Sequence, residues 1–230
     1  MGKDRKYEGE KRSTKLIKAH KQRRAMQQKE FKEILEKNLG ESIGVLQMII
    51  QNHELREEII RAATAMLNAV KNKGIIFTCG NGGSFDDADH TAGELIGWYA
   101  DKTRQRSALA VVPLGGSVGA LTAIANDIGY EYTFSRQLEG FTKTGVANNT
   151  SVLLAFSTSG NSPNVLRAVT AAKTGSITVI AMTGGNGGKL AQEAEIVIKV
   201  PSDVTARIQE AHHVIYHTLC EIIEKEGLGP

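Results

Sequence analysis

Five short apolar runs, each followed by a segment with helical spacing, constrain the fold of this 230-residue chain more than any other feature. The runs contain few polar residues, so both faces of each strand should be buried, as in a parallel sheet covered by helices on both sides. The predicted strands are Ile75–Cys79, Ala108–Val112, Ser151–Phe156, Ile177–Met182 and Glu195–Val200. The pattern predicts an α/β fold, a three-layer, doubly wound sheet of about five parallel strands.

The segments between these strands have apolar residues at the three- and four-residue spacing of amphipathic helices. The predicted helices that follow strands are Asp86–Tyr99, Ser117–Ala125, Tyr132–Thr142, Ser162–Thr174, Gly188–Gln192 and Val204–Glu226. Two further helices precede any strand, with apolar positions from Phe31 to Leu46 and from Leu55 to Val70. These N-terminal helices should cover the sheet or pack against another subunit. Right-handed crossovers would place every strand-to-helix loop at the carboxyl ends of the strands, where ligands bind.

Basic residues are concentrated at the N-terminus of the chain. Residues 1–24 contain ten Lys and Arg against three acidic residues, and the remainder contains 18 basic residues against 22 acidic ones. The like charges and scarce apolar residues predict a flexible leader over residues 1–30, disordered or weakly helical, before a single domain over residues 31–230. A solvated leader and an arm that binds a polyanion or a protein partner both remain open.

The composition argues against several classes of protein. Aromatic residues make up only 5% of the chain, which disfavours a protein that stacks nucleic-acid bases, so nucleic acid is expected to bind only through the leader, if at all. No apolar run approaches the roughly 20 residues that span a bilayer, and no secretory signal is evident. Cys79 and Cys220 lie within apolar runs and are expected to be reduced core thiols of a cytoplasmic protein.

Two strand-to-helix loops share a composition that suits an anion. Residues Gly80–Ser84 follow the first predicted strand, and residues Ser157–Ser162 follow the third. Small residues let the backbone approach a ligand, and hydroxyl and N–H groups at a helix start donate hydrogen bonds to an anion. Such residues are also ordinary turn and N-cap residues, but two such loops on one sheet favour a phosphate site. Neither loop has the P-loop or dinucleotide pattern, which argues against ATP and NAD.

Titratable residues occur at helical spacing after the first loop and again near the C-terminus. His90 and Glu94 are four residues apart and therefore share one helix face, where they could bind a metal, act as acid and base, or form a surface hydrogen bond. The last predicted helix carries Gln209, Glu210, His212, His213 and His217. For His212 and His213, a place beside the site or an interface and a place on plain helix surface remain open, and His20 and His53 have no evident role.

Five motifs occur in order along the chain: CGNGGSFDDADHTAGEL from Cys79, NDIGY from Asn126, STSGNSPNV from Ser157, TGGNGG from Thr183 and ARIQEAHHVIYH from Ala206. Together they resemble the sedoheptulose-7-phosphate isomerases, or phosphoheptose isomerases, of the SIS (sugar-isomerase) superfamily. The resemblance runs from about residue 31 to the C-terminus. It implies an SIS-type fold, a phosphorylated sugar as substrate, and a homotetramer with active sites between subunits.

The resemblance also implies site residues. It implies one zinc ion per active site, held by His90, Glu94, Gln209 and His217. Substrate contacts are expected at Asn81, Gly82, Gly83, Ser84, Glu94, Asn126, Asp127, Ser157, Thr158, Ser159, Ser162 and Gln209. The chain departs from the family at Phe85-Asp86, where His-Cys is usual, at Trp98, near which an Arg is usual, and at Ala206, where an Asp is usual. These departures bear on the choice of sugar more than on the reaction.

Aldose–ketose isomerisation requires a base near carbon, an acid near oxygen, and stabilisation of an enediolate. The hypothesis is that Glu94 takes the carbon-bound proton, that His217 serves the oxygen, and that zinc polarises the carbonyl. Nitrogen and oxygen ligands of this kind suit zinc. Two alternatives remain: an isomerase of another C7 or C8 sugar phosphate, and a non-catalytic SIS-domain regulator or scaffold. A scaffold has no need for all four metal-site residues.

Helix geometry adds one expectation about the metal site. Gln209 and His217 are eight residues apart, which is about 12 Å along a straight helix. Bonds to zinc are only about 2 Å long, so one ion is hard to reach from both positions of a single chain. The spacing therefore predicts a site that combines residues from neighbouring subunits.

Overall fold

The computed structural model describes residues 2–99 and 106–226, with side chains from residue 23 onward except that of residue 25. The chain divides into two compact units, Met1–Gly44 and Val45–Pro230. Helix α1 (Gly2–Gln51) contributes residues to both units. The second unit contains the whole sheet and the helices that follow it.

One sheet of parallel strands organises the second unit, in the order β2-β1-β3-β4-β5. The strands are β1 (Ile76–Cys79), β2 (Val111–Pro113), β3 (Val152–Phe156), β4 (Thr178–Gly184) and β5 (Ile196–Val200). Every residue of β1 and β3 is buried, as the uninterrupted apolar runs predict. The predicted doubly wound α/β fold is therefore confirmed.

The strand order reverses between β1 and β3. From β1 the chain passes to β2 on one side, and it then returns to place β3 on the other side of β1. The loops after two such neighbouring strands lead to helices on opposite faces of the sheet. These loops therefore diverge, and a crevice forms between them at the carboxyl ends of the strands. The fold thus places the loops after β1 and β3 on either side of this crevice.

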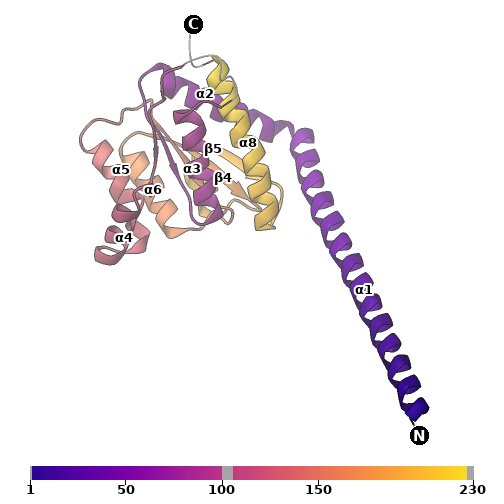
Figure 1. Cartoon of the computed structure of the whole chain (residues 1–230). Coiled ribbons are helices and arrows are strands. Elements are labelled where there is room, and N and C mark those ends of the chain that lie inside the picture. Colours follow the sequence, from indigo (N-terminus) through magenta and orange to yellow (C-terminus); the bar gives the residue numbers. More distant parts are fainter. Residues whose placement is uncertain (1, 100–105, 227–230) are drawn as a thin grey trace. The chain divides into compact units, whose positions relative to one another are not determined.

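Helices cover both faces of the sheet (Figure 1). They are α2 (His53–Lys71), α3 (Gly83–Ile96), α4 (Val118–Asp127), α5 (Ser135–Thr142), α6 (Pro163–Thr174), α7 (Gly188–Glu193) and α8 (Thr205–Glu226), with a 3-10 turn, η1, at Tyr130–Tyr132. Alternate residues of β3 enter different cores: Leu154 and Phe156 pack with residues of α2, α3 and α8, and Leu153 and Ala155 pack with residues of α5 and α6. This division produces the three layers that were predicted.

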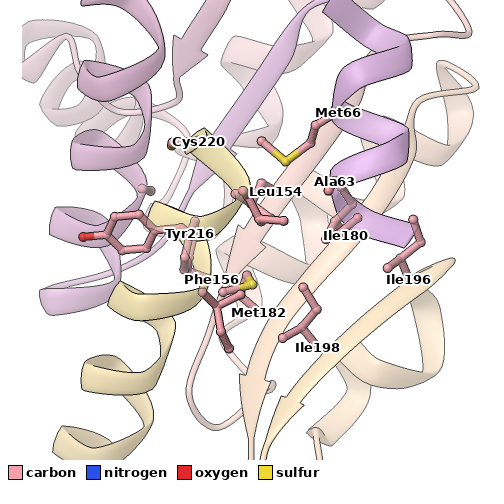
Figure 2. Packing of buried hydrophobic residues seen from close by; sticks show 14 of the residues in the cluster. Ala63, Met66, Leu154, Phe156, Ile180, Met182, Ile196, Ile198, Tyr216 and Cys220 are labelled. Atoms are coloured by element: carbon pink, nitrogen blue, oxygen red, sulfur yellow. The ribbon is translucent and has the colours of Figure 1, made fainter. Parts of the chain in front are cut away.

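Figure 2 shows the core between the sheet and helices α2 and α8. Tyr216 of α8 is fully buried, and its ring centroid lies 6.2 Å from that of Phe156. The hydroxyl oxygen of Tyr216 points away from Phe156 and Leu154 (Figure 2), so the ring belongs to the core and its polar end does not. Cys79 and Cys220 are free and buried, and burial raises the pKa of each thiol to about 12.

Most element boundaries differ from the predicted ones by one to three residues, and two of the differences have a clear structural reason. Strand β2 begins at Val111 and includes Pro113, which an edge strand tolerates because its outer side needs no ladder hydrogen bond. Helix α5 begins at Ser135 because Tyr130–Tyr132 form a separate 3-10 turn, which follows Gly129 at a φ of +129°.

Helix α1 differs from the predicted leader, because it is helical from Gly2 and passes through residue 30 without a break. The segment contains no proline, and pairs such as Lys29–Glu33 and Lys37–Glu41 have the i,i+4 spacing that supports an isolated helix. The predicted polyanion-binding arm depends on side chains of residues 1–22, which lie outside the described residues. Among the described helices, none is both long and apolar enough to cross a bilayer.

Candidate active site

The loops after β1 and β3 are joined by a pair of asparagine side chains. Asn81 and Asn164 each donate an amide hydrogen to the other's carbonyl oxygen, at 2.8 Å in both directions. Asn164 lies in the first turn of α6 and is only 2% exposed. The Gly80–Ser84 loop is therefore fixed to the helix that the second loop enters, and the two predicted anion loops belong to one site.

The second loop, Ser157–Ser162, is a tight turn before α6. The hydroxyls of Ser157 and Ser162 lie 3.1 Å apart, and the backbone N–H of Gly160 donates to the carbonyl of Ser157. Gly160 has a φ of +64°, and a Cβ at this position would lie 1.9 Å from the carbonyl oxygen of Gly187. Only glycine fits there. This turn presents hydroxyls beside the start of a helix, which is the arrangement that binds phosphate.

Two adjoining cavities share Asn81 and Tyr130 in their walls. The first, of about 270 Å³, is apolar on the side formed by Phe85, Leu121 and Phe134. The second, of about 430 Å³, has more polar walls, which include Ser162 and Arg167. Phe85, a departure from the family pattern, therefore helps to shape the space beside the Gly80–Ser84 loop.

Tyr130 is a site residue that sequence reasoning missed. Its hydroxyl donates to Asn81 Oδ1 at 2.8 Å. The predicted substrate contacts Asn126 and Asp127 lie at the end of α4, where both are exposed and hydrogen-bonded to each other at 2.8 Å. Within the NDIGY motif, Tyr130 is the residue that contacts the loop after β1. Its position in that motif could have identified it as a site residue from the sequence.

Titratable side chains of α3 and α8 meet on one face of the sheet, where the two helices lie side by side (Figure 1). His90 Nε2 lies 3.0 Å from Glu94 Oε1, and the ring centroids of His90 and His217 are 5.2 Å apart. One ring nitrogen from each of His90, His213 and His217 lies within 4.8 Å of the others. The structure therefore brings together three of the four predicted metal-site residues, and it adds His213 to them.

Gln209, the fourth predicted ligand, lies at the other end of the contact between α3 and α8. A Cβ on Gly83 would lie 2.6 Å from Gln209 Nε2, so the amide rests on the first turn of α3. Gly83 and His90 are seven residues apart, which is about 10 Å along the helix. Within one chain, Gln209 therefore accompanies the Gly80–Ser84 loop, two turns away from His90.

The environment of the cluster favours the neutral form of two of its imidazoles, those of His213 and His217. The pKa of His213 is lowered by burial and then by neighbouring His90, and the pKa of His217 is lowered by burial and then by His213 and His90. Glu94 opposes both shifts. A neutral imidazole is the form that binds a metal or accepts a proton.

His212 does not lie on plain helix surface, which was one of the two possibilities that the sequence left open. Its side chain is fully buried, and Nε2 lies 3.3 Å from the carbonyl oxygen of Thr183 in β4. Burial lowers the pKa of His212 to about 4. It is a neutral core histidine.

Two further residues beside the cluster were not predicted. Tyr216 Oη lies 2.9 Å from His90 Nδ1 and 2.5 Å from His213 Nδ1. Asp87, one turn before His90, is 8% exposed, and its Oδ2 has no hydrogen-bond partner among the described residues. Burial, and then the neighbouring Asp86, raise the pKa of Asp87 to about 7.

The doubly wound sheet, with two loops of small residues at its switch point, is that of the SIS-domain class of proteins. The family model described as "SIS domain" matches residues 42–184 of the chain, which include both loops. The chain belongs to the phosphoheptose isomerase family within that class, as its relatives establish.

The curated relatives are similar over most of their length. A phosphoheptose isomerase of Leptospira biflexa is 40% identical over 196 residues, which cover 85% of this chain and 96% of that protein. A phosphoheptose isomerase of Helicobacter hepaticus is 45% identical over 172 residues, which cover 75% and 84% of the two chains. Among solved structures, phosphoheptose isomerase GmhA from Neisseria gonorrhoeae superposes with a TM-score of 0.75 at 38% identity and covers 85% of this chain and 99% of that one.

Proposed function

We propose that the chain converts sedoheptulose 7-phosphate to D-glycero-D-manno-heptose 7-phosphate through an enediolate. Besides family membership, the proposal is supported by the proximity of the Gly80–Ser84 loop to a set of acid–base side chains. Helix α3 begins in the Gly80–Ser84 loop and, two turns later, presents His90 and Glu94 beside His217 of α8. An acid–base set next to a phosphate cradle is the arrangement that isomerisation of a phosphorylated sugar requires.

In this proposal the loops hold the substrate. The phosphate is bound by the hydroxyls of the Ser157–Ser162 loop and by the start of α6, and the sugar is held by the predicted contacts in the Gly80–Ser84 loop, Glu94, Asn126, Asp127 and Gln209. The two hydrogen bonds between Asn81 and Asn164 support this assignment because they fix the position of one loop relative to the other.

Glu94 and His217 divide the proton transfers. Glu94 takes a proton from C1 of the ketose as the C1–C2 enediolate forms, and the protonated Glu94, whose proton can exchange with solvent, then delivers a proton to C2. His217 moves the proton between the oxygens on C1 and C2, so that O1 loses one and O2 gains one. The lowered pKa of His217 supports this role because it favours the neutral imidazole, which can accept a proton before it donates one.

The residues present fit a zinc ion. Imidazole nitrogens and a carboxylate oxygen are zinc's usual ligands, and His90, Glu94 and His217 offer them from adjacent helices. These three residues and Gln209 would hold one ion per active site, and the bound metal would supply Lewis-acid polarisation of the carbonyl. The separation of Gln209 from His90 supports a site completed between neighbouring subunits. The homotetramer that the family resemblance implies and the expected cytoplasmic location are part of this proposal.

A second candidate substrate is another C7 or C8 ketose phosphate. Phe85 favours this alternative because it places an apolar ring in the cavity beside the Gly80–Ser84 loop, where the family resemblance indicates histidine. The reaction and its residues would be the same, and only the hydroxyl pattern of the sugar would differ.

The test is to incubate the purified protein with sedoheptulose 7-phosphate alone, with a chelator, and with a chelator followed by excess zinc. The proposal predicts formation of the aldoheptose phosphate, its loss on chelation and its return with zinc. A protein that converts another C7 or C8 ketose phosphate but not this one supports the second candidate. A folded, zinc-supplied protein that binds sugar phosphates but converts none of them is a non-catalytic SIS-domain protein.

A further inference from the structure

The histidine cluster contains one more imidazole, and one more hydroxyl, than the metal site just proposed. His213 and Tyr216 both lie on α8, beside His217. We propose that His213 binds the same metal ion as His90 and His217, and that Tyr216 is the positioning residue that orients the rings of His90 and His213. The inference rests on the proposed metal site and extends it to residues that the family resemblance does not indicate.

The three rings form a compact triangle. The ring centroids of His213 and His217 are 4.3 Å apart, and each lies 5.2 Å from that of His90. His213 and His217 are four residues apart and therefore share one face of α8. Two histidines at this spacing on one helix are a known way to bind zinc, with further ligands supplied by a second element. Here α3 supplies them, as His90 and Glu94.

Tyr216 engages the Nδ1 atom in two of these rings. Its hydroxyl oxygen lies 2.9 Å from Nδ1 of His90 and 2.5 Å from Nδ1 of His213. A phenolic oxygen can accept a hydrogen bond from each ring, so both Nδ1 atoms can carry the proton of the neutral imidazole. That tautomer leaves Nε2 of both rings free to bind a cation. For His90, Nε2 is also the atom that faces Glu94.

The fixed position of Tyr216 gives this hydroxyl its orienting role. The side chain is fully buried against the sheet, in contact with Phe156, and its oxygen points away from that core (Figure 2). Metal-binding histidines commonly have the second ring nitrogen held in this way, and the partner tunes affinity by fixing tautomer and orientation. Tyr216 would hold two rings with one atom.

The cluster is also accessible to an ion. His90 and His213 are exposed, and the side chain of His90 retains 42% of its accessible surface. An exposed imidazole contributes little to the core by packing, so the grouping of three rings at one point is better explained by a shared ligand. The competing explanation is that the rings only pack edge to face, and the experiment must distinguish this packing from binding of a shared metal ion.

The probe is Co²⁺, which absorbs visible light and reports its own coordination, and binding is measured in the absence of sugar. The metal-free full-length protein is titrated with Co²⁺, and affinity is obtained by competition with a chromophoric chelator. The variants are His213→Ala, His213→Cys and Tyr216→Phe. His53→Ala is the matched control, because His53 is an exposed histidine on α2. Circular dichroism checks that each variant is folded.

The proposal predicts that the wild type and His53→Ala bind one Co²⁺ per chain with the same visible spectrum. His213→Ala should weaken binding at least about 10-fold and change the spectrum, and His213→Cys should restore affinity and add a sulfur-to-cobalt charge-transfer band. Tyr216→Phe keeps all ligands and should weaken binding about 10- to 100-fold, as loss of a residue that orients a ligand does.

Three results would overturn the inference. Unchanged affinity and spectrum in His213→Ala would exclude His213 as a ligand, and unchanged affinity in Tyr216→Phe would exclude the positioning role. A wild type that binds no Co²⁺ would exclude both. Because no sugar is present, a failure of the proposed isomerase activity leaves these readouts intact, and an active isomerase that needs no metal would contradict only the metal site.

Discussion

Asn81 and Asn164 exchange two side-chain hydrogen bonds, although 83 residues separate them in the sequence. The two residues come from the two segments that flank the switch point. Asn81 follows β1, and Asn164 lies in the first turn of α6, which follows β3. Tyr130 adds a third hydrogen bond to this group, because its hydroxyl donates to the Asn81 oxygen that also accepts from Asn164. The two loops of the proposed sugar-phosphate site are thus joined by side chains of one chain.

The asparagine pair provides the first prediction. In Asn164→Ala the amide of Asn81 loses its buried partner, so the free energy of unfolding should fall by about 1–3 kcal/mol. The KM for the sugar phosphate should rise about 10-fold, because the Gly80–Ser84 loop is no longer fixed. Denaturant unfolding and steady-state kinetics measure both effects. Asn68→Ala, at an exposed position of α2, serves as control, and equal KM values in the two variants would contradict the coupling.

The proposed acid and base provide the second prediction. Glu94→Gln and His217→Ala should each lower kcat about 10²- to 10⁴-fold, because each removes a proton-transfer group. The chain offers a matched control in His53 and Glu57, another i,i+4 histidine–glutamate pair, which lies exposed on α2. Glu57→Gln should leave kcat unchanged. If Glu94→Gln turns over at the rate of Glu57→Gln, Glu94 is not the base.

The turn before α6 provides the third prediction. Gly160→Ala should destabilise the protein, by about 1–2 kcal/mol for the left-handed conformation alone and further for the clash with Gly187. Gly140→Ala is the control, because a Cβ at this position of α5 meets nothing within 4 Å, and it should instead raise stability by about 0.5–1 kcal/mol. Thermal unfolding of both variants tests the contrast. Opposite shifts are expected, and parallel shifts would contradict the described turn.

The two cysteines provide the fourth prediction. Burial raises the pKa of Cys79 and Cys220 to about 12, and a raised pKa lowers the thiolate fraction at any given pH. At pH 8 only about one thiol in ten thousand would be ionised, and the thiolate is the nucleophile. Iodoacetamide should therefore leave both thiols unmodified in the native protein and modify both in urea, as read by mass spectrometry. Rapid labelling of the native protein would contradict their burial.

The fold could be predicted from the sequence because its signals are local. The apolar runs of β1, β3 and β4 have no polar alternation, which indicates strands buried on both faces, and the pairing of His90 with Glu94 follows from four-residue spacing on one helix. The boundaries of the edge strand were predicted less accurately, because β2 is short and two of its three residues are only partly buried.

The rest of the site depends on how distant segments meet. Tyr130 and Asn164 reach Asn81 only through the path of the chain after α4 and β3, which no local pattern specifies. Tyr216 occupies a core position on α8, so its apolar surroundings gave no hint that its hydroxyl reaches His90. His212 could have been assigned correctly, because it shares the spacing of Ile208, Ile215 and Leu219 on the buried face of α8.

The measurement that tests the central claim most directly is an NMR time course of sedoheptulose 7-phosphate with the zinc-loaded protein in D₂O. An isomerase that works through an enediolate should produce an aldoheptose phosphate that carries deuterium at C2, because the proton held by Glu94 exchanges with solvent. Glu94→Gln should abolish both the conversion and the exchange. A folded, zinc-loaded wild type that leaves the sugar unchanged, with no deuterium at C1, would contradict the assignment of this chain as a phosphoheptose isomerase.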